Sequence, residues 1–90
     1  MAPLNISYEP AFDLLARLIF DEADPDLVLM EYTYAIALEP DHFPQVPGST
    51  ERWARFELLD GRTLVLTFRI ERHKEVVALT GLAIALSAVA

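Results

Sequence analysis

Two arginines, a tryptophan and a threonine in the second half of the sequence have the types and the spacing of an anion-binding surface. They are Trp53, Arg55, Thr67 and Arg69. Their odd-numbered positions place them on one face of two neighbouring strands, opposite the expected core. Guanidinium groups bind phosphate or carboxylate through paired hydrogen bonds, and an indole offers a plane for stacking. The simpler interpretation is a solvated sheet face on which Arg and Glu side chains pair across strands.

Other kinds of chemistry find no support in the sequence. The chain has no cysteine, and its two histidines, His42 and His73, lack a second ligand at helical spacing. The glycines are isolated, which argues against a phosphate-binding loop, and the serines lack the surroundings of a nucleophile. We therefore expect no catalytic residue, no metal ion and no cofactor. An enzyme would be limited to anion chemistry around Arg55 and Arg69.

Charge is divided unevenly along the chain. The net charge is −7, and residues 1–50 hold nine acidic residues against Arg17 alone, whereas residues 51–90 hold six basic and five acidic residues. Nucleic-acid binding through phosphates needs clustered positive charge. We therefore expect no general nucleic-acid binding.

The size and composition of the chain indicate one small domain, residues 1–90. A domain of this length buries only about 60–65% of its unfolded surface. Because the apolar share is 53% and the mean hydropathy is +0.28, we expect part of the apolar surface to lie against a protein partner or a second copy. The absence of cysteine and of a signal peptide favours the cytoplasm. The longest uncharged stretch, residues 76–90, falls short of the ~20 residues of a membrane span, so we expect no membrane anchor.

Periodicity in the first half predicts one strand and two helices. Residues 4–8 alternate between apolar and polar side chains, as a short strand does. A first helix is expected to begin at Pro10. Its predicted inward stripe consists of Ala11, Leu14, Leu15, Leu18 and Ile19. A second helix is expected to have Asp24 as its N-cap and Pro25 as its first residue, and to end before Pro40. Its predicted inward stripe consists of Leu27, Met30, Tyr34, Ala35 and Leu38.

The second half predicts three antiparallel strands after an ordered loop at residues 40–50. Even-numbered side chains are apolar in residues 53–58 and 63–71 and form the expected core face. With a two-residue turn at Asp60-Gly61, the apolar side chains of one strand would pair with the polar side chains of the other. A bulged loop of residues 59–61 instead pairs Phe56 with Leu64 on one apolar face, and we predict this longer loop. After a turn at residues 72–74, residues 76–85 are apolar on both parities, as in a central strand covered on both faces or at a subunit contact.

These elements predict an α+β fold of order β-α-α-β-β-β, with the helices on one face of the sheet. This order, together with residues 38–48 and residues 64–71 followed by Val76-Val77-Ala78-Leu79, resembles the RelE/ParE toxin superfamily over nearly the whole chain. Members of that family are toxins of toxin–antitoxin pairs that cleave mRNA on the ribosome or inhibit gyrase.

The resemblance implies functional positions at Arg55 on the second strand and at Arg69 after Phe68. Nuclease members carry ionisable residues after their last strand, whereas residues 80–85 here hold none. The resemblance therefore implies a protein that acts by binding, gyrase-inhibitor-like or catalytically inactive, and that pairs with an antitoxin peptide. The alternative is a homodimeric α+β interaction or structural module unrelated to toxins, which associates through its apolar last strand or tail.

Overall fold

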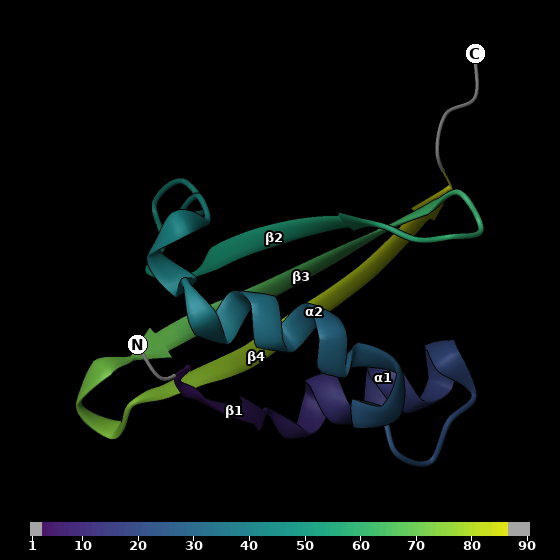
Figure 1. Cartoon of the computed structure of the whole chain (residues 1–90), viewed down its shortest axis with the longest axis horizontal. Helices are drawn as coiled ribbons and strands as arrows, with labels where there is room; N and C mark the ends of the chain where they lie inside the picture. Colours follow the sequence, from purple (N-terminus) through teal and green to yellow (C-terminus); the bar gives the residue numbers. More distant parts are fainter. Residues whose placement is uncertain (1–2, 87–90) are drawn as a thin grey trace.

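The structure is a computed structural model that describes residues 3–86 (Figure 1). Its helices and strands are β1 (Asn5–Tyr8), α1 (Pro10–Phe20), α2 (Asp26–Leu38), β2 (Arg52–Glu57), β3 (Arg62–Glu71) and β4 (Val76–Leu86). Short 3-10 turns lie at Pro40–His42 and Arg72–Lys74. The α+β class and the predicted order of elements are confirmed. The expected apolar tail after β4, residues 87–90, lies outside the described residues.

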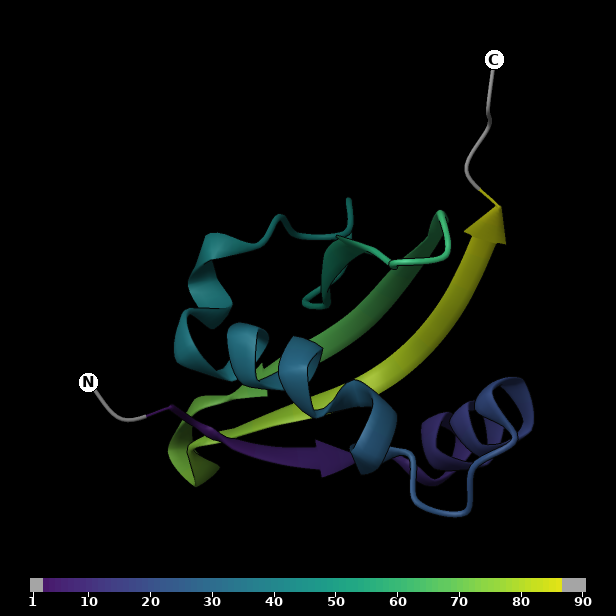
Figure 2. The ribbon, with the colours of Figure 1, turned by 45° about the vertical axis from the view of Figure 1, so that its right-hand side comes forward.

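The strands form a mixed sheet in the order β1-β4-β3-β2. β2, β3 and β4 make the predicted antiparallel meander, and β1 pairs in parallel with the first part of β4, from Asn5 opposite Val76 to Tyr8 opposite Leu79. The last strand of the sequence is thus central, as expected. Figure 2 shows β3 and β4 curving together, with α2 over the inner side of the curve and α1 continuing beyond β1.

The β2–β3 hairpin has the predicted register and loop. Phe56 lies opposite Leu64, the backbone N–H of Leu58 donates to the Arg62 carbonyl at 2.8 Å, and Gly61 has a φ of 87°. A left-handed residue at this position closes a bulged three-residue loop, and glycine adopts it without a Cβ penalty. The apolar even-numbered side chains of both strands therefore face the helices.

A bulge in the β3–β4 ladder explains why β4 is apolar on both parities. The register shifts between Thr67 and Phe68, so that Thr67 lies opposite Gly81 while Phe68 lies opposite Leu79. The inward side chains of Leu64 and Leu66 therefore lie opposite even-numbered β4 residues, whereas those of Phe68 and Ile70 lie opposite odd-numbered ones. β4 is covered on both faces at residues 77–79, which are buried, whereas Ala83 and Ala85 are exposed in the single chain, so the alternative of a subunit contact there stays a prediction.

The core lies between the sheet and the inner sides of both helices. Its residues are Phe12, Ala16, Leu29, Ile36, Ala54, Leu64, Leu66, Phe68, Val77 and Leu79. The predicted inward stripes of α1 and α2 are therefore wrong, because all ten of their residues are exposed. In α1 the apolar residues cover well over half of the circumference, and in α2 they occur on every side, so the apolar period alone does not define which side packs on the sheet.

The start of α2 differs by one residue from the prediction. The helix begins at Asp26 rather than at Pro25, yet Oδ1 of Asp24 accepts the backbone N–H of Asp26 at 3.1 Å, as a capping side chain does. The helix ends at Leu38, before Pro40, as predicted. No helix within residues 3–86 is long and apolar enough to cross a membrane.

The loop at residues 43–51 is ordered by contacts to β2. Gln45 forms an isolated bridge with Arg52, and the backbone N–H of Trp53 donates to the Pro44 carbonyl at 3.0 Å. The ring of Phe43 lies edge-on to Phe68 at 5.9 Å between centroids. The loop is therefore anchored in the core by an aromatic side chain, in agreement with the sequence.

Candidate functional site: the outer sheet face and the helix surface

The four predicted site residues share the outer face of β2 and β3, away from the helices. Trp53 lies directly opposite Thr67, and Arg55 lies opposite Val65. Arg69 is two residues beyond Thr67 on the same strand, so its side chain points to the same face. Trp53 is 37% exposed and Arg55 is exposed, while Thr67 and Arg69 are half-buried.

The two arginines do not converge on one anion. The register separates them by four residues along β3 and one strand across, which is roughly 14 Å between Cα atoms. Nη2 of Arg69 lies 3.2 Å from Oε2 of Glu9, at the start of α1 and on the side of Arg69 away from Arg55. Nη2 of Arg55 lies 3.5 Å from Oε1 of Glu57. Each guanidinium group already has a carboxylate partner, so this face resembles a solvated, charge-paired sheet surface more than an anion cradle.

Thr67 has a structural contact of its own. Its Oγ1 lies 3.2 Å from Oγ1 of Thr80, the residue without a partner at the bulge. A Cβ added to Gly81 would overlap Oγ1 of Thr67. A side chain at position 81 would therefore force the Thr67 side chain to move.

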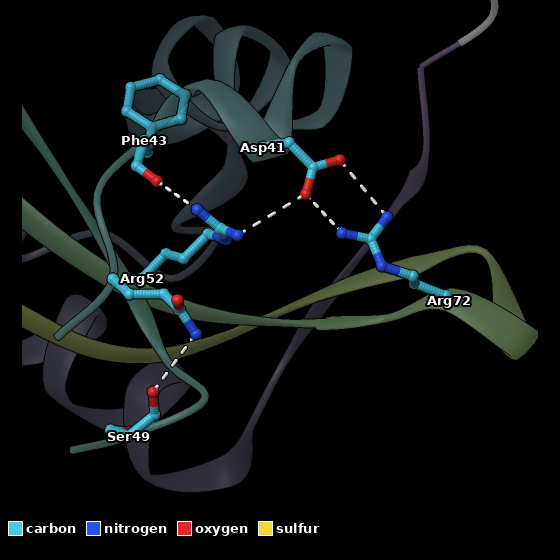
Figure 3. A network of polar contacts seen from close by, with 6 residues as sticks. Asp41, Phe43, Ser49, Arg52 and Arg72 are labelled. Atoms are coloured by element: carbon cyan, nitrogen blue, oxygen red, sulfur yellow. Dashed lines mark hydrogen bonds and ion pairs between the residues drawn. The ribbon is translucent and has the colours of Figure 1, made fainter. Parts of the chain in front are cut away.

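The remaining arginines of the sheet half are also paired. Asp41 lies between two guanidinium groups: Arg72 donates to both carboxylate oxygens, and Nη2 of Arg52 lies 3.6 Å from Oδ1 (Figure 3). Arg52 also donates to the Phe43 carbonyl at 2.6 Å. The hydrogen bond from Arg72, followed by the charges of Arg72 and Arg52, lowers the pKa of Asp41. This network connects the 3-10 turn after α2 with the start of β2 and with the turn between β3 and β4.

The hairpin loop holds a further pair. The guanidinium Nε of Arg62 donates to Oδ2 of Asp60 at 2.7 Å, and its backbone N–H donates to Oδ1 at 3.0 Å. That backbone bond is the main reason that the pKa of Asp60 is lowered. Every arginine from position 52 to position 72 thus lies beside a carboxylate. Because carboxylates of the same chain pair with these five arginines, residues 52–72 offer little free positive charge to phosphates.

The surface that stands out is apolar and lies on the helices. On the outer side of α2, four side chains form a line that we call the α2 ridge: Leu27, Met30, Tyr34 and Leu38, which are 68%, 59%, 55% and 43% exposed. Leu14 and Leu18 of α1 are 61% and 71% exposed. Single exposed apolar residues are ordinary, but a continuous row of large ones is typical of an interaction surface.

A hollow of about 450 Å³ lies beside this ridge, between α2 and β1. Its lining residues are Pro3, Leu4, Ile6, Tyr8, Asp26, Met30, Thr33, Tyr34 and Ala37. Met30 and Tyr34 belong to both the hollow and the ridge. The hydroxyl of Tyr8 donates to Oδ1 of Asp26 at 2.7 Å, and burial, followed by this bond, raises the pKa of Tyr8. A second hollow of about 280 Å³ lies between the hairpin loop and the first half of α2, where Val28 and Tyr32 line it.

Neither histidine lies in a cluster of metal ligands: within residues 3–86, no three His, Asp or Glu side chains are placed to hold a metal ion. The four predicted site residues are therefore located but not assembled into a pocket, and the helix surface was missed. The sequence contained one indication of this surface, because a helix that is apolar on every side is typical of a buried helix, and α2 has apolar residues on every side. Comparisons of the chain with protein-family models, with curated proteins and with solved structures give no match.

Proposed function

We propose that this protein acts by binding another protein chain through its helix surface. The observation that carries the proposal is the α2 ridge, whose four large apolar side chains are 43–68% exposed, while Leu29 and Ile36 on the inner side of the helix are buried in the core. Full burial of one such side chain by a partner would contribute roughly 1.5–3 kcal/mol to the free energy of binding. An interface on this side would supply the burial that a small domain lacks.

The element order β-α-α-β-β-β supports the role of a toxin–antitoxin component of the RelE/ParE type that works without nuclease chemistry. Nuclease members of that family carry ionisable groups after their last strand. Here β4 runs to Leu86, and neither residues 80–85 within it nor residues 87–90 of the sequence include an ionisable side chain. In this proposal the chain either inhibits a target such as gyrase or is inactive, and an antitoxin peptide covers it. A cytoplasmic location is part of the proposal, because the chain contains no cysteine that would mark an oxidising compartment.

Co-expression with any small gene that lies directly upstream or downstream of this one tests the toxin–antitoxin proposal. We expect slower growth when this chain is expressed alone, relief by the neighbouring product, and co-purification of the two chains. A matched control carries Tyr34→Ser on the α2 ridge, and it is expected to fold but to lose the neighbouring product during purification. Normal growth together with no co-purifying chain would contradict the proposal.

A homodimeric module is the second candidate, and the same ridge favours it. Light scattering over a range of protein concentrations distinguishes the two. A dimer that Tyr34→Ser abolishes would support the homodimeric module. A monomer at all concentrations would contradict the module and leave binding to a different protein chain as the proposed function.

A further inference from the structure

Most acidic side chains that lie outside the ion pairs of residues 3–86 are gathered in one part of the fold; the others are Glu51, Glu71 and Glu75 of the sheet half. Among residues 3–86 the ion pairs connect five acidic side chains with six arginines, and none of them involves an acidic residue between positions 21 and 39. These acidic residues are Asp21, Glu22, Asp24, Asp26, Glu31 and Glu39. All of them belong to α2 or to the segments that flank it. Uncompensated negative charge is therefore concentrated around one helix.

These carboxylates border the α2 ridge. Glu31 is four residues after Leu27 and three before Tyr34, so it lies beside the ridge on the helix surface. Asp26 lines the adjoining hollow, and Glu39 follows the last ridge residue, Leu38. Three of the remaining acidic residues lie in the connection before the helix. The ridge is thus an apolar strip with negative charge at both ends and along one side.

Building on the proposed binding function, we propose that the α2 ridge binds a cationic amphipathic helix of a partner protein. Ridge residues at spacings of three and four form a row about 16 Å long, which a helix of about three turns would match. The hollow beside Met30 and Tyr34 lies next to this row and would accept a side chain of the docked helix. Lysine or arginine at the edges of that helix would lie near the unbalanced carboxylates, whose field speeds association.

The same charges disfavour the other occupants of this surface. A second copy docked ridge to ridge would bring two acidic surfaces together, and like charges across an interface weaken binding. An anionic membrane or a nucleic acid would be repelled for the same reason. A neutral or acidic helix would gain the apolar contacts alone.

The probes are three labelled peptides of about 18 residues. The first is built of Leu and Lys with helical amphipathic spacing, the second has Glu in place of every Lys, and the third has the composition of the first in an order without amphipathic spacing. Fluorescence anisotropy measures their binding to the full chain. We expect the first to bind at least about tenfold more tightly than either of the others, and its affinity to fall as NaCl is raised.

Paired variants separate the apolar from the electrostatic contribution. Tyr34→Ser and Leu38→Ser should each weaken binding of the cationic peptide by about tenfold or more. Leu59→Ser, which alters an exposed leucine at the hairpin tip, should leave the affinity unchanged. The double variant Glu31→Gln, Glu39→Gln should weaken binding and flatten its salt dependence. Glu75→Gln, which removes an exposed charge in the turn before β4, should do neither.

Three outcomes overturn the inference. The first is equal binding of the cationic and the Glu-containing peptides. The second is a loss with Glu75→Gln as large as that with the ridge-border variants. The third is a chain that dimerises through the ridge and binds none of the peptides, which removes the cationic partner but leaves the proposed binding function standing. If the ridge binds no peptide, no second copy and no product of the neighbouring gene, the proposed function fails as well.

Discussion

The phenol of Tyr8 donates a 2.7 Å hydrogen bond to Oδ1 of Asp26, and this contact joins the edge strand β1 to the first turn of α2. The two residues are 18 positions apart in the sequence, and α1 lies between them. Near the other end of α2, the backbone N–H of Leu4 donates to the Ala37 carbonyl at 3.0 Å. Together these two bonds hold α2 along β1 and set the width of the hollow beside the α2 ridge.

Replacing Tyr8 by Phe removes the donor and keeps the aromatic ring that stacks on Phe12 at 5.4 Å. We expect Tyr8→Phe to lower the free energy of unfolding by about 1 kcal/mol, because Asp26 is exposed and regains water. Urea unfolding at neutral pH measures this. A change smaller than the experimental error would contradict this, because it would mean that the Tyr8–Asp26 hydrogen bond stabilises the folded protein no more than hydrogen bonds of the two groups to water do.

The same variant predicts a pH effect in the alkaline range. The pKa of Tyr8 is raised in the folded protein, mainly by burial, so folding favours the protonated phenol. Its contribution to stability is complete below the ordinary tyrosine pKa of about 10 and is lost as pH rises above it. The difference in stability between the original chain and Tyr8→Phe should therefore shrink above about pH 10, and a constant difference would contradict the assignment.

Asp41 predicts the opposite dependence at acid pH. Because Arg72 and then Arg52 lower its folded pKa, the ionised carboxylate contributes stability above its ordinary pKa of about 4, and this contribution is lost as pH falls. We expect Asp41→Asn to lose less stability than the original chain between about pH 5 and pH 2. Chemical unfolding over this range checks it. Glu75→Gln, an exposed acid in none of the ion pairs of residues 3–86, should retain the acid dependence of the original chain.

Gly81 and Thr67 predict a coupled pair of substitutions. A Cβ at position 81 overlaps Oγ1 of Thr67, so Gly81→Ala should destabilise the protein by about 1–3 kcal/mol. Thr67→Ala removes the obstructing hydroxyl. The double variant should therefore be more stable than the sum of the two single effects predicts, by about 1 kcal/mol or more. Additive effects in a double-mutant cycle by urea unfolding would contradict a direct clash.

Leu27 and Leu29 provide a matched test of which side of α2 is buried. Leu29 is fully buried and Leu27 is 68% exposed. Leu29→Ala should cost about 2–5 kcal/mol of stability, whereas Leu27→Ala should change it by no more than about 0.5 kcal/mol. Thermal or urea unfolding of dilute protein measures both. Equal costs in the monomer would mean that the two sides of α2 are packed alike.

The sheet was more predictable than the helices. In β2 and β3 strict alternation combines with Asp60-Gly61, and only one register puts Phe56 and Leu64 on a common face. In α2 an apolar residue occurs on every side, so the stripe with the clearest spacing proved to be the exposed one. The partner of β1 was not predictable either, because β4 lies about 70 residues further along the chain and nothing local specifies parallel pairing with it.

The predicted site residues illustrate what strand parity can establish. Parity placed Trp53, Arg55, Thr67 and Arg69 on one face, and the structure has them there. Parity does not give the pairing of each arginine, which depends on contacts such as Arg69 with Glu9, 60 residues away. The helix surface was not predicted because the sequence pattern of an apolar stripe is the same whether the stripe packs against the chain's own core or faces outward.

The position of β4 between β1 and β3 has a consequence for the order of events during synthesis. β1 leaves the ribosome before α1, α2, β2 and β3, and the strand that must lie beside it is made after all four of them. Until then β1 has no neighbour in the sheet, and Leu29 and Ile36 of α2 lack the surface of β4 on which the core closes. Folding through such distant contacts is slow, and a nascent chain with exposed apolar segments is prone to aggregate. A nascent chain stalled before Val76 should therefore be a substrate for chaperones, and release of β4 should end that dependence.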